Sequence, residues 1–154
     1  MKRWTSKSEA LQKLQRYCAY QERSHKEVRG KLLDLGIYGD DLEEVIAQLI
    51  ADNFLNEERF ARAYARGKFR MKQWGRRRIV QELKRHQVSE YSIRKALEEI
   101  PTQDYVETLQ EIIQKKNTAL AETDDYIKRN KIAQYAISRG YEPDLVWQIL
   151  EASF

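Results

Sequence analysis

The sequence predicts an all-α protein built from three tandem three-helix repeats of a helix-turn-helix-like kind. Apolar residues recur at helical spacing, capping residues mark the helix ends, and one pattern of apolar positions returns after 51 and then 53 residues. Strand-like alternation and Asn-Gly or Asp-Gly hairpin turns are absent from the sequence. Because stacked units of this kind bury a continuous core, we expect nine helices in a curved, elongated array.

The first repeat is expected at 1–53. Its first two helices begin at Ser6 and Ser24, because each serine is followed three residues later by a glutamate, the spacing of a capping box. Gly36 ends the second helix, since glycine readily adopts the left-handed conformation that closes a helix. These signals and the apolar spacing place helices at 6–22, 24–35 and 40–53.

The middle repeat is expected at 54–101. Asn56 can cap its first helix, and the two glutamates that follow suit the positive end of the helix dipole. Pro101 ends its last helix, because proline cannot continue a helical hydrogen-bond ladder. The helices are expected at 57–73, 75–86 and 89–100.

The last repeat is expected at 102–154. Thr123 precedes two aspartates and marks a helix start, and Gly140 marks a stop. The helices are expected at 103–122, 124–139 and 143–152. The three repeats align position by position: Val28 with Ile79 and Ile132, Leu32 with Leu83 and Ala136, Gly36 with Gln87 and Gly140.

The charge is concentrated in the middle of the chain. The segment 59–86 holds eleven basic residues and a single acid, Glu82, a net charge of +10. The preceding residues carry a net −2 and the following ones a net −4, so the overall charge of +4 conceals a strongly basic centre. Such a segment indicates a phosphate-rich or acidic partner.

Four arginines follow one another at helical spacing in the helix at 57–73, with no acid between them along the stripe. Ordinary surface helices mix signs, because like charges four residues apart repel. The opposite face, formed by Phe60, Tyr64, Gly67 and Met71, is expected to be core. The arginine stripe consists of Arg59, Arg62, Arg66 and Arg70.

The start of the helix at 75–86 carries three further arginines, Arg76 to Arg78. Cations there oppose the helix dipole, so the exposed amides and the guanidinium groups together predict an anion-binding site. Phe69 and Trp74 lie among the basic residues, where they could stack on a base or pack between repeats. The expected partner- or DNA-binding surface comprises Arg59, Arg62, Arg66, Lys68, Arg70, Lys72, Arg76, Arg77, Arg78, Lys84 and Arg85.

Several function classes are disfavoured by the sequence. The one cysteine, Cys18, cannot form an internal disulfide and is expected to be buried, and His25 and His86 are expected at the surface without metal-ligand companions. No phosphate-binding loop or nucleophile motif is present, so we expect no cofactor and no enzymatic activity. No apolar run suits a membrane span or a signal peptide, and a cytoplasmic location is expected.

Two segments resemble the signature of the RecX family of bacterial recombination regulators: 54–64 (FLNEERFARAY) and 75–83 (GRRRIVQEL). The stretch 17–24 (YCAYQERS) is similar to that family as well. The resemblance implies three three-helix repeats without catalytic activity that bind the RecA recombinase. It also implies binding in the groove of the RecA–DNA filament and inhibition of the ATPase, strand-exchange and co-protease activities of RecA, which serve DNA repair and the SOS response.

On this basis we expect RecA and its filament on DNA as partners, single- or double-stranded DNA as a further candidate, no membrane, and a monomeric chain. Two other hypotheses remain open. The chain could be a stand-alone DNA- or RNA-binding module, since each short helix pair looks like a helix-turn-helix. It could instead be a structural adaptor whose partner binds the acidic flanks.

Overall fold

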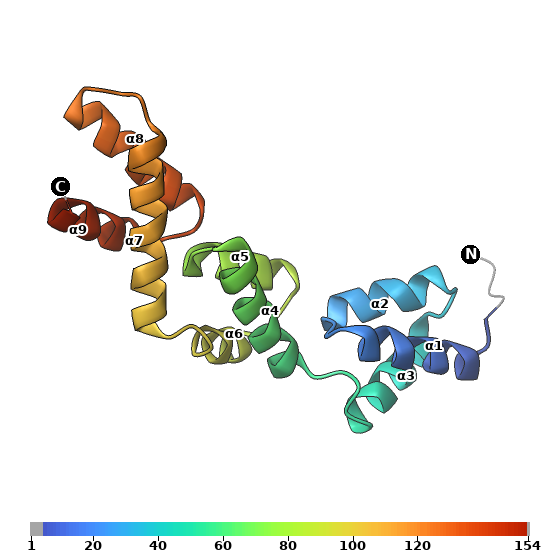
Figure 1. The fold of residues 1–154 in the computed structure, drawn as a ribbon. Helices are drawn as coiled ribbons and strands as arrows, with labels where there is room; N and C mark the ends of the chain where they lie inside the picture. The colour runs from blue at the N-terminus through green and yellow to red at the C-terminus, as the bar shows by residue number, and fades with distance from the viewer. Residues whose placement is uncertain (1–4, 154) are drawn as a thin grey trace. The chain divides into compact units, whose positions relative to one another are not determined.

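A computed structural model describes residues 5–153, and within them the chain forms nine α-helices and no strand (Figure 1). The all-α prediction is therefore confirmed for this part of the chain. Most helix ends lie within two residues of their expected positions, and the largest differences are the earlier ends of the sixth and seventh helices. The helices are α1 (Lys7–Tyr20), α2 (His25–Asp34), α3 (Gly39–Ala51), α4 (Glu57–Lys72), α5 (Arg76–Arg85), α6 (Glu90–Leu97), α7 (Thr102–Ala119), α8 (Asp125–Ser138) and α9 (Pro143–Ser153).

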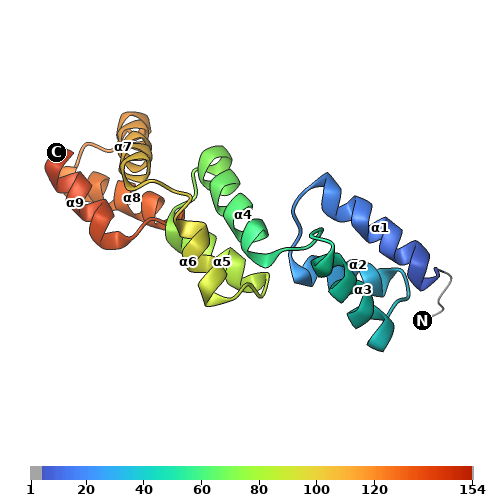
Figure 2. The ribbon, with the colours of Figure 1, turned by 90° about the horizontal axis from the view of Figure 1, so that it is seen from below.

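The chain divides into two compact units. The first unit contains residues 5–64 and 83–96, and the second contains residues 65–82 and 97–153. The division falls inside α4 and α5, so the middle three helices contribute to both units. Within the first unit α1, α2 and α3 pack on one another, and within the second α7, α8 and α9 do the same, as Figures 1 and 2 show.

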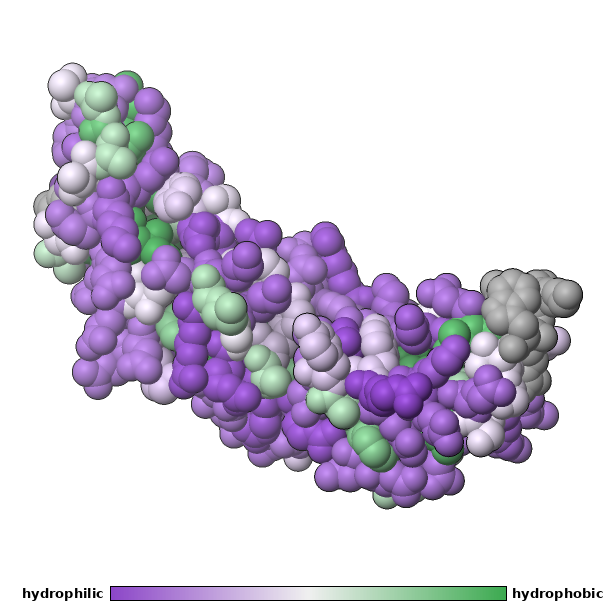
Figure 3. Space-filling view, turned by 45° about the vertical axis from the view of Figure 1, so that its right-hand side comes forward, coloured by the Kyte–Doolittle hydropathy of each residue, from purple (hydrophilic) through white to green (hydrophobic). Residues whose placement is uncertain are grey.

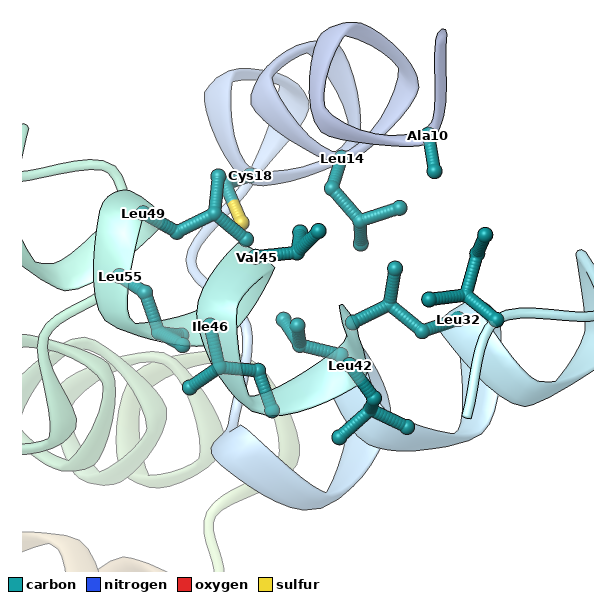
Figure 4. Packing of buried hydrophobic residues seen from close by; sticks show 11 residues of the cluster. Ala10, Leu14, Cys18, Leu32, Leu42, Val45, Ile46, Leu49 and Leu55 are labelled. Carbon is teal, nitrogen blue, oxygen red and sulfur yellow. The ribbon is translucent and has the colours of Figure 1, made fainter. Parts of the chain in front are cut away.

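The core of the first unit is aliphatic. Leu14 and Cys18 of α1 point toward Val45 and Leu49 of α3, with Leu32 of α2 beside them (Figure 4). All five side chains are buried. Burial raises the pKa of the Cys18 thiol to about 11, so the thiol stays protonated and unreactive at neutral pH. The prediction of a buried cysteine is confirmed.

The predicted capping residues act in three of four cases. Ser24 accepts a hydrogen bond from the Glu27 amide (3.0 Å), and the Glu27 carboxylate accepts one from the Ser24 amide (2.9 Å), which completes a capping box. Ser6 and Asn56 likewise accept from the amides three residues later. The prediction of Thr123 as a cap was wrong: Asp124 caps α8, because its carboxylate accepts from the Ile127 amide (3.0 Å).

The internal repeat is visible in both burial and backbone conformation. The aligned residues Val28, Ile79 and Ile132 are all buried. Two positions beyond the last residue of α2, α5 and α8, the backbone has a positive φ in each repeat, although one of the three residues is not glycine: Gly36 (81°), Gln87 (61°) and Gly140 (103°). The next amide always bonds a carbonyl five residues back: Ile37 to Leu32 (2.9 Å), Val88 to Leu83 (3.1 Å) and Tyr141 to Ala136 (3.3 Å). The three helix ends therefore share one Schellman-type geometry.

Gln87 is exposed in the left-handed conformation, which disfavours residues with a Cβ atom. We expect Gln87→Gly to stabilise the fold by about 1 kcal/mol, because glycine enters this conformation without steric cost. Urea unfolding followed by circular dichroism measures the change. Gln81→Gly, at an exposed position inside α5, is the matched control and should destabilise by about 1 kcal/mol. A loss of stability in both variants would contradict the interpretation.

The buried face of α4 differs from the expected one. Phe60 is buried as predicted, but Met71 is 83% exposed. Ala61, Ala65 and Phe69 are buried instead, at spacings of four residues. The prediction was wrong for Met71, because the buried stripe of α4 runs through Ala61, Ala65 and Phe69 and leaves Met71 on the solvent side.

Candidate partner-binding surface

The basic segment, residues 59–86, is distributed over both units, and its side chains fall into three groups. Some are paired with acids of the chain, some lie against aromatic rings, and some are exposed without a polar partner among the described residues. Only the last group keeps its full capacity to bind an external anion.

Arg59 and Arg62 of the first unit are paired with acids. The Arg59 guanidinium donates to the Glu22 carboxylate (2.7 Å) and to the Asn53 carbonyl oxygen (3.0 Å), which ties the start of α4 to the loops before it. Arg62 donates to Glu58, one turn earlier in α4 (2.9 Å). The sequence-based argument that no acid neutralises this stripe was therefore wrong for these two arginines.

Two further arginines are paired within the second unit. The Arg66 guanidinium donates to the Glu99 carboxylate at 2.6 Å. The Arg76 guanidinium donates to Glu142 at 3.0 Å and lies 3.9 Å from the centre of the Tyr105 ring. Arg76 is accordingly a structural residue that fastens the start of α5 to the segments around Tyr105 and Glu142.

The amides at the start of α5 are occupied by the chain itself. The Gly75 amide donates to the Arg139 carbonyl oxygen (2.8 Å), the Arg76 amide to the Tyr105 hydroxyl (2.9 Å) and the Arg77 amide to the Gly140 carbonyl oxygen (2.9 Å). The sequence predicted that these amides would help to bind an external anion. That part of the prediction was wrong, because the amides already donate to groups of the chain. The Glu142 carboxylate, bonded to Arg76, supplies a negative charge beside this helix start, where it suits the dipole.

Glu142 is the centre of a small polar network in the second unit. The Tyr105 hydroxyl donates to its carboxylate, and Arg76 donates to the other oxygen. Burial alone would raise the pKa of Glu142, but the hydrogen bonds from Tyr105 and Arg76 outweigh burial and lower that pKa below its usual value. Burial and the bond to Glu142 raise the pKa of Tyr105 far above its usual value. The carboxylate is therefore charged and the phenol neutral at pH 7.

Trp74 lies close to two cations of the same unit. The Lys68 ammonium is 5.0 Å and the Arg78 guanidinium 4.2 Å from the centre of its ring, both within the range of cation–π attraction. Phe69, by contrast, is buried with its ring 6.0 Å from that of Tyr105. Packing rather than base stacking is thus the role of Phe69.

Within the basic segment, four exposed side chains have neither a polar side-chain partner nor an aromatic ring beside them among residues 5–153: Arg70, Lys72 and Arg77 in the second unit and Lys84 in the first. We call these four residues the exposed cations. Arg85 is exposed as well, and its carbonyl oxygen accepts a hydrogen bond from Lys26 (3.0 Å). Of the eleven basic residues selected from the sequence, the exposed cations are the ones best placed to meet a partner.

Several residues that shape this surface could not be recognised from local sequence patterns. Glu22, Glu99 and Glu142 lie far along the chain from the arginines they neutralise, so only the fold brings them together. Glu58 is the exception, because its spacing of four residues from Arg62 is a recognisable helix pair. Arg139 was also not among the site residues predicted from the sequence. Its guanidinium donates to the Lys72 carbonyl oxygen.

The histidines are less exposed than expected. Both are half-buried, and the His86 ring packs 5.3 Å from Phe60 and 5.5 Å from Tyr64, with Nδ1 3.1 Å from the Ser24 hydroxyl. Within residues 5–153 no cluster of three His, Cys, Asp or Glu side chains could hold a metal ion. None of the helices described here has the length and apolarity needed to cross a membrane.

Comparison with protein families finds three consecutive matches. Residues 10–49 match the family domain described as RecX, first three-helix domain. Residues 56–97 match the second such domain and residues 103–150 the third. The order of the matches is the order of the three helical repeats, and the tandem three-helix architecture is confirmed.

Named relatives give the same result. The regulatory protein RecX of Pelodictyon phaeoclathratiforme is 30% identical over 133 residues, which are 85% of this chain and 79% of that protein. The chain belongs to the RecX family. The RecX protein of Clostridium perfringens strain 13 is 33% identical over 124 residues and that of Bacillus cytotoxicus 28% over 135 residues. This RecX-family chain spans 58% and 50% of the lengths of those two relatives.

Solved structures agree on the fold. The crystal structure of RecX from Lactobacillus salivarius has a TM-score of 0.86 at 25% identity, over 95% of both chains. A second crystal structure, of a regulatory protein RecX, has a TM-score of 0.85 at 18% identity, over 94% of this chain and 71% of that one. The helical arrangement is therefore that of RecX proteins.

Proposed function

We propose that this chain is a regulatory protein that binds the RecA recombinase in its filament on DNA and inhibits the ATPase, strand-exchange and co-protease activities of RecA. Membership of the RecX family carries the proposal, since relatives that match across all three helical domains are regulatory proteins RecX. It acts through binding alone, in the cytoplasm, without a cofactor.

The surface chemistry supports a polyanionic target. The exposed cations Arg70, Lys72 and Arg77 lie within the same eight-residue stretch of the second unit, and Lys84 adds to the first. Unpaired cations raise the local concentration of a negatively charged partner and accelerate its association. Figure 3 shows one face of the molecule, on which hydrophilic residues predominate and hydrophobic ones form small separate patches. A polar contact with acidic RecA surface, DNA phosphate or both suits such a face.

Reversal of the exposed cations tests the proposal. We expect the combined variant Arg70→Glu, Lys72→Glu and Arg77→Glu to bind RecA filaments more weakly in co-sedimentation, by roughly tenfold or more. Its inhibition of RecA's DNA-dependent ATPase should weaken by a similar factor. The variant should fold, because these side chains make no polar contact within residues 5–153. Arg76 is left unchanged because its pairing with Glu142 is structural.

The matched control replaces three basic residues at other surface positions, outside the basic segment, with glutamate: Lys13, Arg16 and Lys115. It should inhibit like the original protein. Equal inhibition by both variants would refute the assignment of the surface. Sedimentation with naked single-stranded DNA at two salt concentrations separates the two candidate targets. Binding to naked DNA as tight as to filaments, with a steep fall at high salt, would instead identify a stand-alone nucleic-acid-binding module.

A further inference from the structure

The second unit has an apolar groove that lies outside the basic segment. It has a volume of about 580 Å³ and is formed by the end of α7 and one face of α8. Figure 3 shows hydrophobic residues at the surface in this region, near the top of the view. The described residues that line the groove are Lys116, Leu120, Tyr126, Ile127, Asn130, Lys131, Gln134 and Tyr135.

This face of α8 is unusual for the solvent side of a helix. Its opposite face is buried through Ile132 and Ala136, so the helix already satisfies its packing requirement there. The outer face nevertheless exposes 77% of Tyr126, 43% of Ile127 and 37% of Tyr135. Isolated exposed apolar residues are common, but several that line one groove indicate an interaction surface.

The polar rim of the groove is cationic. Two lysines line it, and none of its described lining residues is acidic. The Lys116 ammonium lies 4.4 Å from the centre of the Tyr135 ring, while Arg139 is 5.8 Å from the same ring. Lys131 is paired with Glu122 at 3.5 Å, and just over half of its side chain remains exposed. An apolar floor with a cationic rim is complementary to a ligand that combines apolar side chains with carboxylates.

We propose that this groove docks an acidic amphipathic peptide segment of a partner protein. Apolar side chains of the segment lie on Leu120 and Ile127, and its carboxylates pair with Lys116 and Lys131. A nucleic-acid strand fits less well, because only two lysines line the groove, whereas such a strand carries a negative charge at every nucleotide. The inference goes beyond the proposed function, since it uses none of the basic segment.

Fluorescence anisotropy with a defined probe tests the inference. The probe is a labelled peptide that alternates pairs of glutamates with leucine or phenylalanine, used with the full chain. We expect saturable binding that Tyr126→Ser with Ile127→Ser weakens by about tenfold or more, because anchors of this kind dominate interface energy. Ile50→Ser with Tyr91→Ser is the matched control, of the same residue types exposed elsewhere, and should bind like the original chain.

A second pair of variants tests whether the lysine at the rim of the groove attracts the carboxylates of the peptide. Lys116→Glu should weaken the peptide complex several-fold, whereas Lys115→Glu, at an exposed position beside the groove, should not. Three results would overturn the inference: no binding of the peptide, equal weakening by both members of either pair, or stronger binding of a labelled oligothymidylate through Tyr126 and Ile127. The last result would mark the groove as a single-strand binding site.

Discussion

Replacing Gly75 with alanine should destabilise the second unit by about 3–5 kcal/mol. A Cβ atom at this position would lie 2.2 Å from the Gly140 carbonyl carbon and 2.4 Å from the Tyr141 amide nitrogen. Both are backbone atoms that cannot move aside as a flexible side chain can. The clash would also separate the Gly75 amide from the Arg139 carbonyl oxygen, and with it the start of α5 from the turn between α8 and α9.

Urea unfolding followed by circular dichroism measures this loss. Gly67→Ala is the matched control, because Gly67 lies inside α4 and a Cβ atom there meets nothing within 4 Å. Alanine has a higher helix propensity than glycine, so the control should gain about 0.5–1 kcal/mol. An unchanged stability of Gly75→Ala, with the control behaving as expected, would show that the two glycine turns are not in close contact.

Replacing Glu142 with glutamine is expected to cost about 2–3 kcal/mol at pH 7. The amide is similar in shape, but it removes the charge that Arg76 and the Tyr105 hydroxyl both bond, and a half-buried guanidinium is left without its counter-ion. Glu151→Gln, at an exposed position in α9, is the control and should change stability by less than about 0.5 kcal/mol. Arg76→Met, alone and combined with Glu142→Gln, gives the coupling energy between the two residues.

The effect of this substitution should depend on pH. The pKa of Glu142 is lowered in the folded state, so its stabilising contribution is complete above the pKa of the unfolded chain, about 4.3. That contribution is lost as the pH falls through the folded-state pKa. The difference in unfolding free energy between the original chain and Glu142→Gln should therefore shrink below about pH 4. A difference that stays constant from neutral to acidic pH would contradict the role of the charge.

Much of the helical architecture could be predicted from the sequence because its determinants are local. A serine three residues before a glutamate marks a capping box, and such start and stop signals together with apolar spacing predict all nine helices of residues 5–153. Even Gln87 was aligned correctly with two glycines, although only the structure shows that it shares their left-handed backbone. The internal repeat could be recognised in the sequence because buried, apolar residues recur at the same positions in each copy.

The state of the basic residues could not be predicted in the same way. Whether an arginine is free or paired depends on acids contributed by remote segments, as Glu99 does for Arg66 and Glu142 for Arg76. Local charge patterns cannot report such long-range pairs. The sequence therefore selected a surface of eleven cations, whereas the structure pairs several of them with acids: Arg59, Arg62, Arg66 and Arg76. Without the fold, no local pattern distinguishes Arg70, Lys72 and Arg77 from the arginines that are paired with acids.

The contact between Gly75 and Gly140 also has a consequence for biosynthesis. The two glycines are 65 residues apart, and residues 65–82 belong to the same compact unit as residues 97–153. A chain emerging from the ribosome can complete α1 to α3 early, since the core of these helices is made from residues 10–55. The start of α5 must wait until residue 140 has been translated. During this interval the start of α5, which lies in the most positively charged part of the chain, lacks its final packing.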